Sequence, residues 1–404
     1  MDSLIYVLQS IVLFPIAYFF VGFLVKKISF KFLEKREHRL GCIDGLRGYL
    51  AIFVFITHGQ LTWHYNITGD WGGNPLIKSN FGFIGVSLFF MITGYLFISK
   101  IVVRKGKVDW LYLFESRIFR IYPLYIFVLF LVSVIVFSSD PNINSSFGSL
   151  FYDYFKWLVF YGGNINEYKN TTVIVAGVIW TLKYEWMFYL ALPLIAKVIF
   201  KFKTLGVLAL LVLSLVGYFF PFTIITAISS EYLILFFIGG GVVYLNTTNI
   251  INKIDFDSFS CSAFTLLFFL FSVLTSKSYP TLSLISLVLV FITICNGTSI
   301  FGLLSTKSSI LLGEISYSIY LIHGVILYTF FTIFNIIDLG EYGFIAFNLI
   351  LLPLMTMLVI IISSLTFLYI EKPGIDLGKK RYLVSSLIML KNITSLHKNY
   401  LRSK

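Results

Sequence analysis

Long apolar stretches alternate with short polar segments along almost the whole chain. A helix needs about 20 mostly apolar residues to cross the hydrocarbon core of a bilayer. Applied to this sequence, that criterion predicts eleven spans, at roughly 4–25, 44–62, 81–103, 121–139, 173–200, 204–220, 229–246, 259–276, 281–299, 309–336 and 342–370. We therefore expect an all-α fold, a polytopic bundle of about 11 transmembrane helices.

Composition narrows the class of protein. Hydrophobic residues make up 58% of the 404 residues and charged residues only 12%, whereas a soluble domain is near half apolar and a quarter charged. So little polar surface excludes a cytosolic enzyme, a secreted domain and a disordered chain. The three cysteines, Cys42, Cys261 and Cys295, form neither a CxxC nor a Cys/His ligand spacing, so we expect no disulfide framework and no metal site.

The positive charges predict the orientation in the membrane. The first apolar stretch, Leu4 to Val25, is followed rather than preceded by lysines, which is unlike a cleavable signal peptide. Placing the N-terminus outside and the C-terminus in the cytoplasm puts most of the 31 Lys and Arg residues on the cytoplasmic side, as membrane proteins prefer. The outside keeps Lys78, Lys156, Lys169 and Lys277. This distribution explains the net charge of +12 without nucleic acid, and we expect the basic tail to lie against membrane lipid.

The second predicted span carries ionisable residues, which are costly in a membrane and mark function by default. Arg47 and His58 are eleven residues apart, so on a helix they lie within roughly 20° of one face. Asp44 precedes Arg47 by three residues. His58 lies about 21 Å from Asp44 along the helix axis. Helix capping is the alternative for Asp44, and a hydrogen-bonded core position is the alternative for His58. For Arg47 a structural role is less favoured, because a cation in the first turn opposes the helix dipole.

Two later spans contain further polar residues. On a continuous helix entered at Val173, Glu185 lies about 18 Å deep, near the midplane. Lys183 cannot share its face, so Glu185 needs a cation, a histidine or water, and an intramembrane ion pair is the structural alternative. In the tenth span Glu314 lies near the cytoplasmic start and His323 about 21 Å in, the depth of His58.

Arg117 and Arg120 lie three residues apart on one face of a short amphipathic stretch between the third and fourth spans. Cytoplasmic arginines commonly determine topology. Bidentate capture of an anionic phosphate group is the alternative.

Aromatic residues crowd the predicted outer loop. They are typical of an interfacial belt, with stacking against a sugar as the alternative, and they comprise Trp63, His64, Tyr65 and Trp71.

Several motifs are absent from the sequence. It has no P-loop, GxGxxG, HExxH or GxSxG pattern. The sequence therefore lacks the motifs that are typical of ATP-driven transport, dinucleotide chemistry and serine hydrolysis.

An ordered set of segments resembles the acyltransferase-3 family of membrane acyltransferases over roughly residues 40–375. Asp44-Gly-Leu-Arg47 followed by His58 resembles its Arg-x10-His signature. The other segments are Phe81–Tyr95 with Thr93-Gly94, Arg117-Ile-Phe-Arg120-Ile-Tyr-Pro123, Trp180-Thr-Leu-Lys-Tyr-Glu185-Trp-Met-Phe-Tyr189, Ile315–His323 and Glu371-Lys-Pro373. Threonine replaces the family's serine at 93 and 181, and Lys183 is unusual.

The resemblance implies three regions: an additional N-terminal transmembrane helix and basic cytoplasmic loop (1–39), a ten-helix acyltransferase domain (40–375) and a basic cytoplasmic tail (376–404). It implies transfer of an acyl group, commonly acetyl, from cytoplasmic acyl-CoA such as acetyl-CoA to a hydroxyl of a cell-surface glycan or lipid-linked sugar. A bacterial inner membrane is the expected location, and no permanently bound cofactor is expected.

Residue roles follow from the same resemblance. His58 is expected to act as a general base or to carry the acyl group, assisted by Arg47, Asp44 and Glu185. Arg117 and Arg120 are expected to bind the donor. Substrate binding is expected from Trp180, Tyr189, His323 and Thr93.

The alternative from another class is a proton-coupled transporter or flippase, with Asp44, Arg47, His58 and Glu185 as its relay. The lack of a detectable inverted repeat and the paired cytoplasmic arginines disfavour it.

Overall fold

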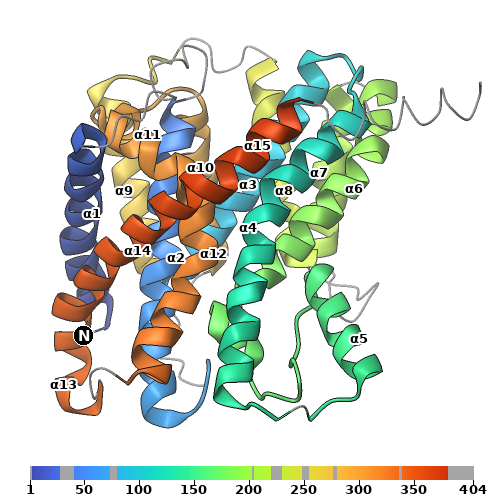
Figure 1. Ribbon diagram of the computed structural model, residues 1–404. Helices are drawn as coiled ribbons and strands as arrows, with labels where there is room; N and C mark the ends of the chain where they lie inside the picture. Colours follow the sequence, from blue (N-terminus) through green and yellow to red (C-terminus); the bar gives the residue numbers. More distant parts are fainter. Residues whose placement is uncertain are drawn as a thin grey trace, which may run out of the picture.

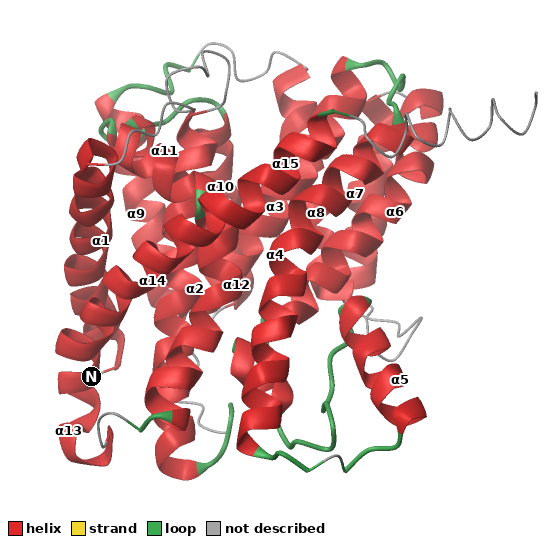
Figure 2. Cartoon of the chain, viewed as in Figure 1, coloured by secondary structure: helices red, strands yellow, loops and turns green. Residues whose placement is uncertain are grey.

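The computed structural model describes residues 2–27, 41–72, 80–142, 144–202, 204–219, 230–247, 254–275, 280–335 and 339–380. Over these residues the chain is a bundle of helices, and the only extended pairing is an isolated bridge between Ile165 and Tyr168 (Figures 1 and 2). The predicted outer-loop residue Lys78 and the basic tail beyond Lys380 lie outside the described residues.

The helices follow one another along the chain with short connections. They are α1 (Asp2–Lys27), α2 (Gly41–Thr68), α3 (Asn80–Val103), α4 (Trp110–Ser139), α5 (Phe147–Leu158), α6 (Ile179–Phe202), α7 (Thr204–Phe219), α8 (Ser230–Thr247), α9 (Phe259–Thr275), α10 (Pro280–Cys295), α11 (Lys307–Glu314), α12 (Ser316–Tyr328), α13 (Leu339–Ala346), α14 (Leu352–Thr366) and α15 (Lys372–Lys379). Two short 3-10 turns, η1 (Thr171–Val175) and η2 (Leu303–Ser305), precede α6 and α11. Three π-helical turns, η3 (Thr329–Ile333), η4 (Phe347–Leu351) and η5 (Phe367–Glu371), extend α12 and join α13, α14 and α15.

The structure confirms an all-α fold of the polytopic membrane type. Four helical segments of the described chain are long and apolar enough to cross a bilayer, at Phe81–Val103, Trp110–Ser139, Ser316–Ile333 and Gly343–Lys379. Shorter apolar helices lie at Val12–Leu24, Tyr232–Asn246, Phe259–Thr275 and Pro280–Cys295. The outer surface is apolar as well, since Phe130, Leu194 and Leu267 are at least 60% exposed, which suits contact with lipid. Helix covers at least part of each of the eleven predicted ranges, and the number that cross the membrane stays a prediction.

Two predicted spans are interrupted. In the range 173–200, Ala176 and Gly177 have φ of 52° and 68°, a left-handed conformation that stops a helix. The helix α6 therefore begins only at Ile179, and the depth of Glu185 counted along a continuous helix from Val173 was wrong. In the range 309–336, Ile315 separates α11 from α12.

Two predicted loop segments are helical instead. Arg117 and Arg120 lie within α4, which starts at Trp110 because the Asp109 side chain accepts a hydrogen bond of 3.0 Å from the Tyr112 backbone N–H, a typical N-cap. The predicted short stretch and the fourth span are thus one helix. On the other side, α2 extends to Thr68, so three of the four outer aromatic residues lie on the helix itself.

Glycines permit the helices around α2 and α3 to approach closely. A Cβ added at Gly313 would lie 1.7 Å from the Asp44 carbonyl oxygen, and one added at Gly94 would lie 1.9 Å from the Phe236 carbonyl oxygen. Such small residues are typical of membrane helix interfaces. The first contact places α11 against the start of α2, and the second places α8 against α3.

The start of α2 lies at the end of the bundle that holds α11 and α15 (Figure 1), and the N-terminus and α5 lie at the opposite end. The first and last helices of the described chain thus begin and end at opposite ends of the bundle.

Candidate active site

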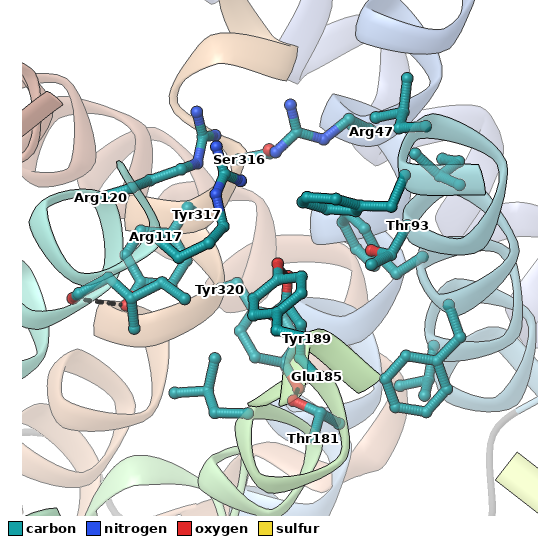
Figure 3. Close-up of a pocket in the computed structure, with 18 of the residues that line it drawn as sticks. Arg47, Thr93, Arg117, Arg120, Thr181, Glu185, Tyr189, Ser316, Tyr317 and Tyr320 are labelled. Atoms are coloured by element: carbon teal, nitrogen blue, oxygen red, sulfur yellow. Dashed lines mark hydrogen bonds between the residues drawn. The ribbon is translucent and has the colours of Figure 1, made fainter. Parts of the chain in front are cut away.

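A cavity of about 410 Å³ lies between α2, α3, α4, α6 and α12 (Figure 3). Seven of the ten predicted site residues line it, and they come from four different helices. These residues are Asp44, Arg47, Thr93, Arg117, Arg120, Glu185 and Tyr189. The remaining three, His58, His323 and Trp180, are not among the lining residues.

Three arginines meet at one end of the cavity. Figure 3 shows Arg47 approaching from one side and Arg117 and Arg120 from the other. Guanidinium groups hold phosphates through paired N–H donors, and none of the three charges lies alone. The Arg47 Nη1 atom lies 3.9 Å from the Asp44 carboxylate, and the Arg117 guanidinium carbon lies 5.3 Å from the centroid of the Phe97 ring.

Glu371 supplies a buried carboxylate behind Arg120. Its side chain is fully buried, its Oε1 lies 3.9 Å from Arg120 Nη2, and its Oε2 accepts a 2.8 Å hydrogen bond from Ser318 Oγ. Sequence analysis placed Glu371 in a family motif but gave it no role. The signal that could have found it is an acidic residue at the inner end of the last apolar span.

Glu185 finds a partner on its own helix. The Tyr189 hydroxyl, one turn further along α6, donates a hydrogen bond to the Glu185 carboxylate. Lys183 is oriented away, with Nζ 5.3 Å from the centroid of the Tyr161 ring, as expected for an i,i+2 neighbour. The observed partner is therefore a tyrosine hydroxyl, which was not among the cation, histidine or water that the sequence suggested.

Two hydroxyl groups lie at the end of the cavity away from the arginines (Figure 3). The Thr181 Oγ1 and Tyr320 Oη atoms lie 2.6 Å apart, and both residues line the cavity. The Tyr320 hydroxyl also lies 3.2 Å from the Val178 carbonyl oxygen. Its ring packs edge-on against His323 at a centroid distance of 6.4 Å, so this wall of the cavity adjoins a pair of histidines.

His58 and His323 are in direct contact beyond that wall. His58 Nδ1 lies 2.9 Å from His323 Nε2, and the two rings are nearly parallel at a centroid distance of 5.1 Å. The equal depths that the sequence predicts thus correspond to a contact. His323 is fully buried, whereas His58 is half-buried and stacks on Trp71 at a centroid distance of 6.3 Å.

Trp180 lies in an aromatic cluster outside the cavity. Its ring packs against Tyr232 at 4.7 Å, Tyr184 at 5.6 Å and Phe90 at 6.2 Å between centroids. Of these residues Phe90 lines the cavity. Trp180 therefore supports the cavity wall from behind.

Over the part of the chain that the structure describes, no group of three or more His, Cys, Asp or Glu residues is arranged to hold a metal ion. The groups in the cavity suit an anion instead, because three guanidinium groups face one volume. The apolar part of the wall, which includes Val86, Phe89 and Leu182, suits an aliphatic chain.

Comparison with known proteins places the chain among acyltransferases. The acyltransferase domain of the acyltransferase-3 family matches residues 40–369. The O-acetyltransferase OatA of Staphylococcus aureus is 26% identical over 201 residues, which are 47% of this chain and 30% of OatA. The putative peptidoglycan O-acetyltransferase YrhL of Bacillus subtilis is 26% identical over 177 residues, which are 40% of this chain and 24% of YrhL.

A third relative is covered over most of its length. The putative acetyltransferase ORF330 of Acidianus two-tailed virus is 26% identical over 324 residues, 75% of this chain and 88% of the relative. The chain thus aligns with less than a third of OatA and YrhL and with most of ORF330. No solved structure matches the chain.

Proposed function

This chain belongs to the acyltransferase-3 family, and we propose that it transfers an acyl group, acetyl in the first instance, from a cytoplasmic acyl-CoA to a hydroxyl of a cell-envelope glycan or lipid-linked sugar. The observation that carries the proposal is the arginine-lined cavity that ends at Tyr320, next to the His58–His323 pair. This arrangement offers a site for an anionic donor on one side of a candidate base.

The donor occupies the cavity. In coenzyme A the phosphate groups lie at one end of an uncharged arm. The cavity matches this arrangement, because it has arginines at one end and an apolar wall beyond them. Arg47, Arg117 and Arg120 hold the phosphates at one end. The arm then follows the apolar wall towards Thr181 and Tyr320, which brings the thioester towards the histidines.

The acceptor approaches His58 from the other side. Trp71 stacks on the His58 ring, and an aromatic face of this kind also suits the apolar face of a sugar. His58 takes the proton from the acceptor hydroxyl and the oxygen attacks the thioester carbonyl. The carbon–sulfur bond then breaks, and the leaving thiolate takes the proton back from His58.

The names of the relatives support a cell-envelope acceptor. OatA is an O-acetyltransferase and YrhL is named for peptidoglycan, so peptidoglycan is the first acceptor to test. We further propose an integral protein of the bacterial inner membrane with its N-terminus outside, because this orientation puts the arginine end of the cavity in the compartment that holds acyl-CoA.

The contacts disfavour proton-coupled transport or flipping as an alternative. A relay through Asp44, Arg47, His58 and Glu185 needs a continuous chain of hydrogen bonds. Asp44 contacts Arg47, whereas Glu185 is bonded by Tyr189 and His58 contacts His323. Glu185 and His58 are thus each bonded to a residue outside the supposed relay.

Mass spectrometry of the surface glycan tests the function. A strain that lacks the protein is complemented with the wild-type chain or with the His58→Ala variant, at equal protein levels. We expect acylated glycan with the wild type and none with the variant. Release of CoA from acetyl-CoA by the purified wild-type protein, dependent on a glycan acceptor, is the matching assay in vitro. Identical acylation in the deletion and wild-type strains, together with no CoA release, would overturn the proposal.

A further inference from the structure

A chain of two hydrogen bonds connects the backbone of α12 to the ring of His58. His323 Nδ1 lies 2.9 Å from the carbonyl oxygen of Ile319, one turn earlier on the same helix. His323 Nε2 lies 2.9 Å from His58 Nδ1. Both ring nitrogens of His323 therefore take part in these two hydrogen bonds. On His58, Nδ1 takes part and Nε2 does not.

The carbonyl group sets the direction of both bonds. A carbonyl oxygen only accepts, so His323 Nδ1 must carry the hydrogen. An imidazolium removed entirely from water is costly, so the fully buried His323 ring is neutral and its Nε2 is an acceptor. The hydrogen between the two rings consequently belongs to His58 Nδ1. In the neutral His58 ring, Nε2 then has a free electron pair.

We propose that His323 is a positioning residue that fixes the Nδ1–H tautomer of His58 and thereby makes Nε2 of His58 the atom that takes the acceptor proton. The catalytic part of this inference rests on the proposed function. Proton transfer to His58 Nε2 gives an imidazolium whose Nδ1–H is still held by His323. Return of the Nε2 proton to the leaving thiolate restores the neutral ring, so that no proton is gained or lost over the cycle.

The surroundings of His323 hold its ring in place. A Cβ added at the next residue, Gly324, would lie 2.4 Å from the backbone carbon of Val175, so α12 packs directly on the η1 segment. The Phe55 ring contacts His323 edge-on at a centroid distance of 6.2 Å, and Tyr320 contacts it from its own helix. A ring confined in this way can orient its neighbour without moving during the reaction.

Nitrogen NMR of the full chain in lipid discs tests the tautomer without any substrate. The histidines are labelled with ¹⁵N, and the His58 signals are identified by their loss in the His58→Ala variant. We expect a hydrogen on Nδ1 and none on Nε2 of His58 at neutral pH. In the His323→Met variant, which replaces the ring-nitrogen acceptor with a much weaker thioether acceptor at similar volume, we expect the hydrogen of His58 to shift towards Nε2, the form that free imidazole side chains favour.

Kinetics on a matched pair of variants test the consequence. His323→Met should lower kcat by on the order of 10²- to 10⁴-fold without changing KM for acetyl-CoA, because His323 does not line the donor cavity. His323→Gln keeps an acceptor oxygen within reach of His58 Nδ1 and should recover most of that loss. General damage to the fold would change KM and would not distinguish the two variants.

Three results would overturn the inference: a hydrogen on Nε2 of His58 in the unmodified protein, a His323→Met variant with wild-type kcat, or a folded His323→Gln variant as inactive as His323→Met. If the wild-type protein transfers no acyl group, the proposed function fails, and the NMR measurement still decides the tautomer.

Discussion

Glu371 contacts Arg120 from the far end of the chain, with 3.9 Å between the carboxylate and the guanidinium group. The contact depends on a close approach of α15 to α4, where a Cβ added at Gly374 would lie 2.5 Å from the Phe119 carbonyl oxygen. The η5 turn, directly before α15, thus supplies the countercharge for one of the cavity arginines. Glu371 lies just beyond residues 40–369, the range that matches the family domain.

Glu371→Gln is expected to lower the free energy of unfolding by about 2 kcal/mol. Removal of one partner from a fully buried ion pair costs more, on the order of 3–5 kcal/mol, but the Arg120 side chain keeps 20% exposure to the cavity. Denaturant or thermal unfolding of the purified protein measures the change. The control is Asp376→Asn on α15, where the pair with Lys379 is exposed and contributes at most about 1 kcal/mol. Equal effects of the two substitutions would contradict a buried pair.

Arg117→Ala and Arg120→Ala are expected to weaken acetyl-CoA binding by more than the ~1 kcal/mol typical of exposed ion pairs. Both guanidinium groups face the cavity, where they are partly shielded from water. Arg104→Ala is the control, because Arg104 is exposed in the turn between α3 and α4. Calorimetric titration with acetyl-CoA separates the variants. Unchanged affinity at normal protein levels would leave Arg117 and Arg120 as topology determinants only.

His58→Ala is expected to abolish acyl transfer, because the loss of a proton-transfer group typically costs 10²- to 10⁴-fold. The base must be neutral to accept a proton. Activity should therefore be present above the pKa of the His58 imidazole and decline as the pH falls through it. The measurement is kcat as a function of pH. His64→Ala, on the same helix but outside the cavity and the His58–His323 pair, should retain activity, and loss of activity only in this second variant would exclude His58 as the base.

Gly94→Ala is expected to destabilise the fold by about 1–3 kcal/mol, the range for overpacking. The added methyl would lie 1.9 Å from the backbone oxygen of Phe236, and backbone atoms cannot rotate away as a side chain can. At Gly241 on α8 the same methyl would lie 3.4 Å from the Leu211 side chain, which is an ordinary contact. Unfolding of the Gly94→Ala and Gly241→Ala variants should therefore differ, and equal stability would argue against close packing of α3 on α8.

Cysteine labelling in intact cells tests the predicted orientation. After replacement of the three native cysteines, a cysteine at Asn144 should react with a reagent that does not cross membranes, and cysteines at Lys105 or Lys380 should not. Asn74, a second predicted outer site, lies outside the described residues. Labelling at Lys105 without permeabilisation would reverse the orientation and move the cavity arginines away from the cytoplasm.

Sequence alone was sufficient for the fold class and for seven of the residues that line the cavity. Apolar runs long enough to span a bilayer identify helices directly, because the membrane allows little other backbone structure. Asp44 and Arg47 could be placed together because helical periodicity is local. The ordered motifs predicted that Thr93, Arg117 and Glu185 belong to one site. The structure places all three on the wall of the same cavity.

Only the tertiary structure decided how the groups are paired. The contacts of His58 with His323 and of Arg120 with Glu371 join helices that are distant in the chain, and helical periodicity does not specify which faces meet. The break at Ala176 also escaped prediction, because an alanine in a left-handed conformation has no local sequence signal and is held there by packing against α12. Which residues share one face of a helix is a local property of the sequence. Which other helix contacts that face depends on how all the helices pack together.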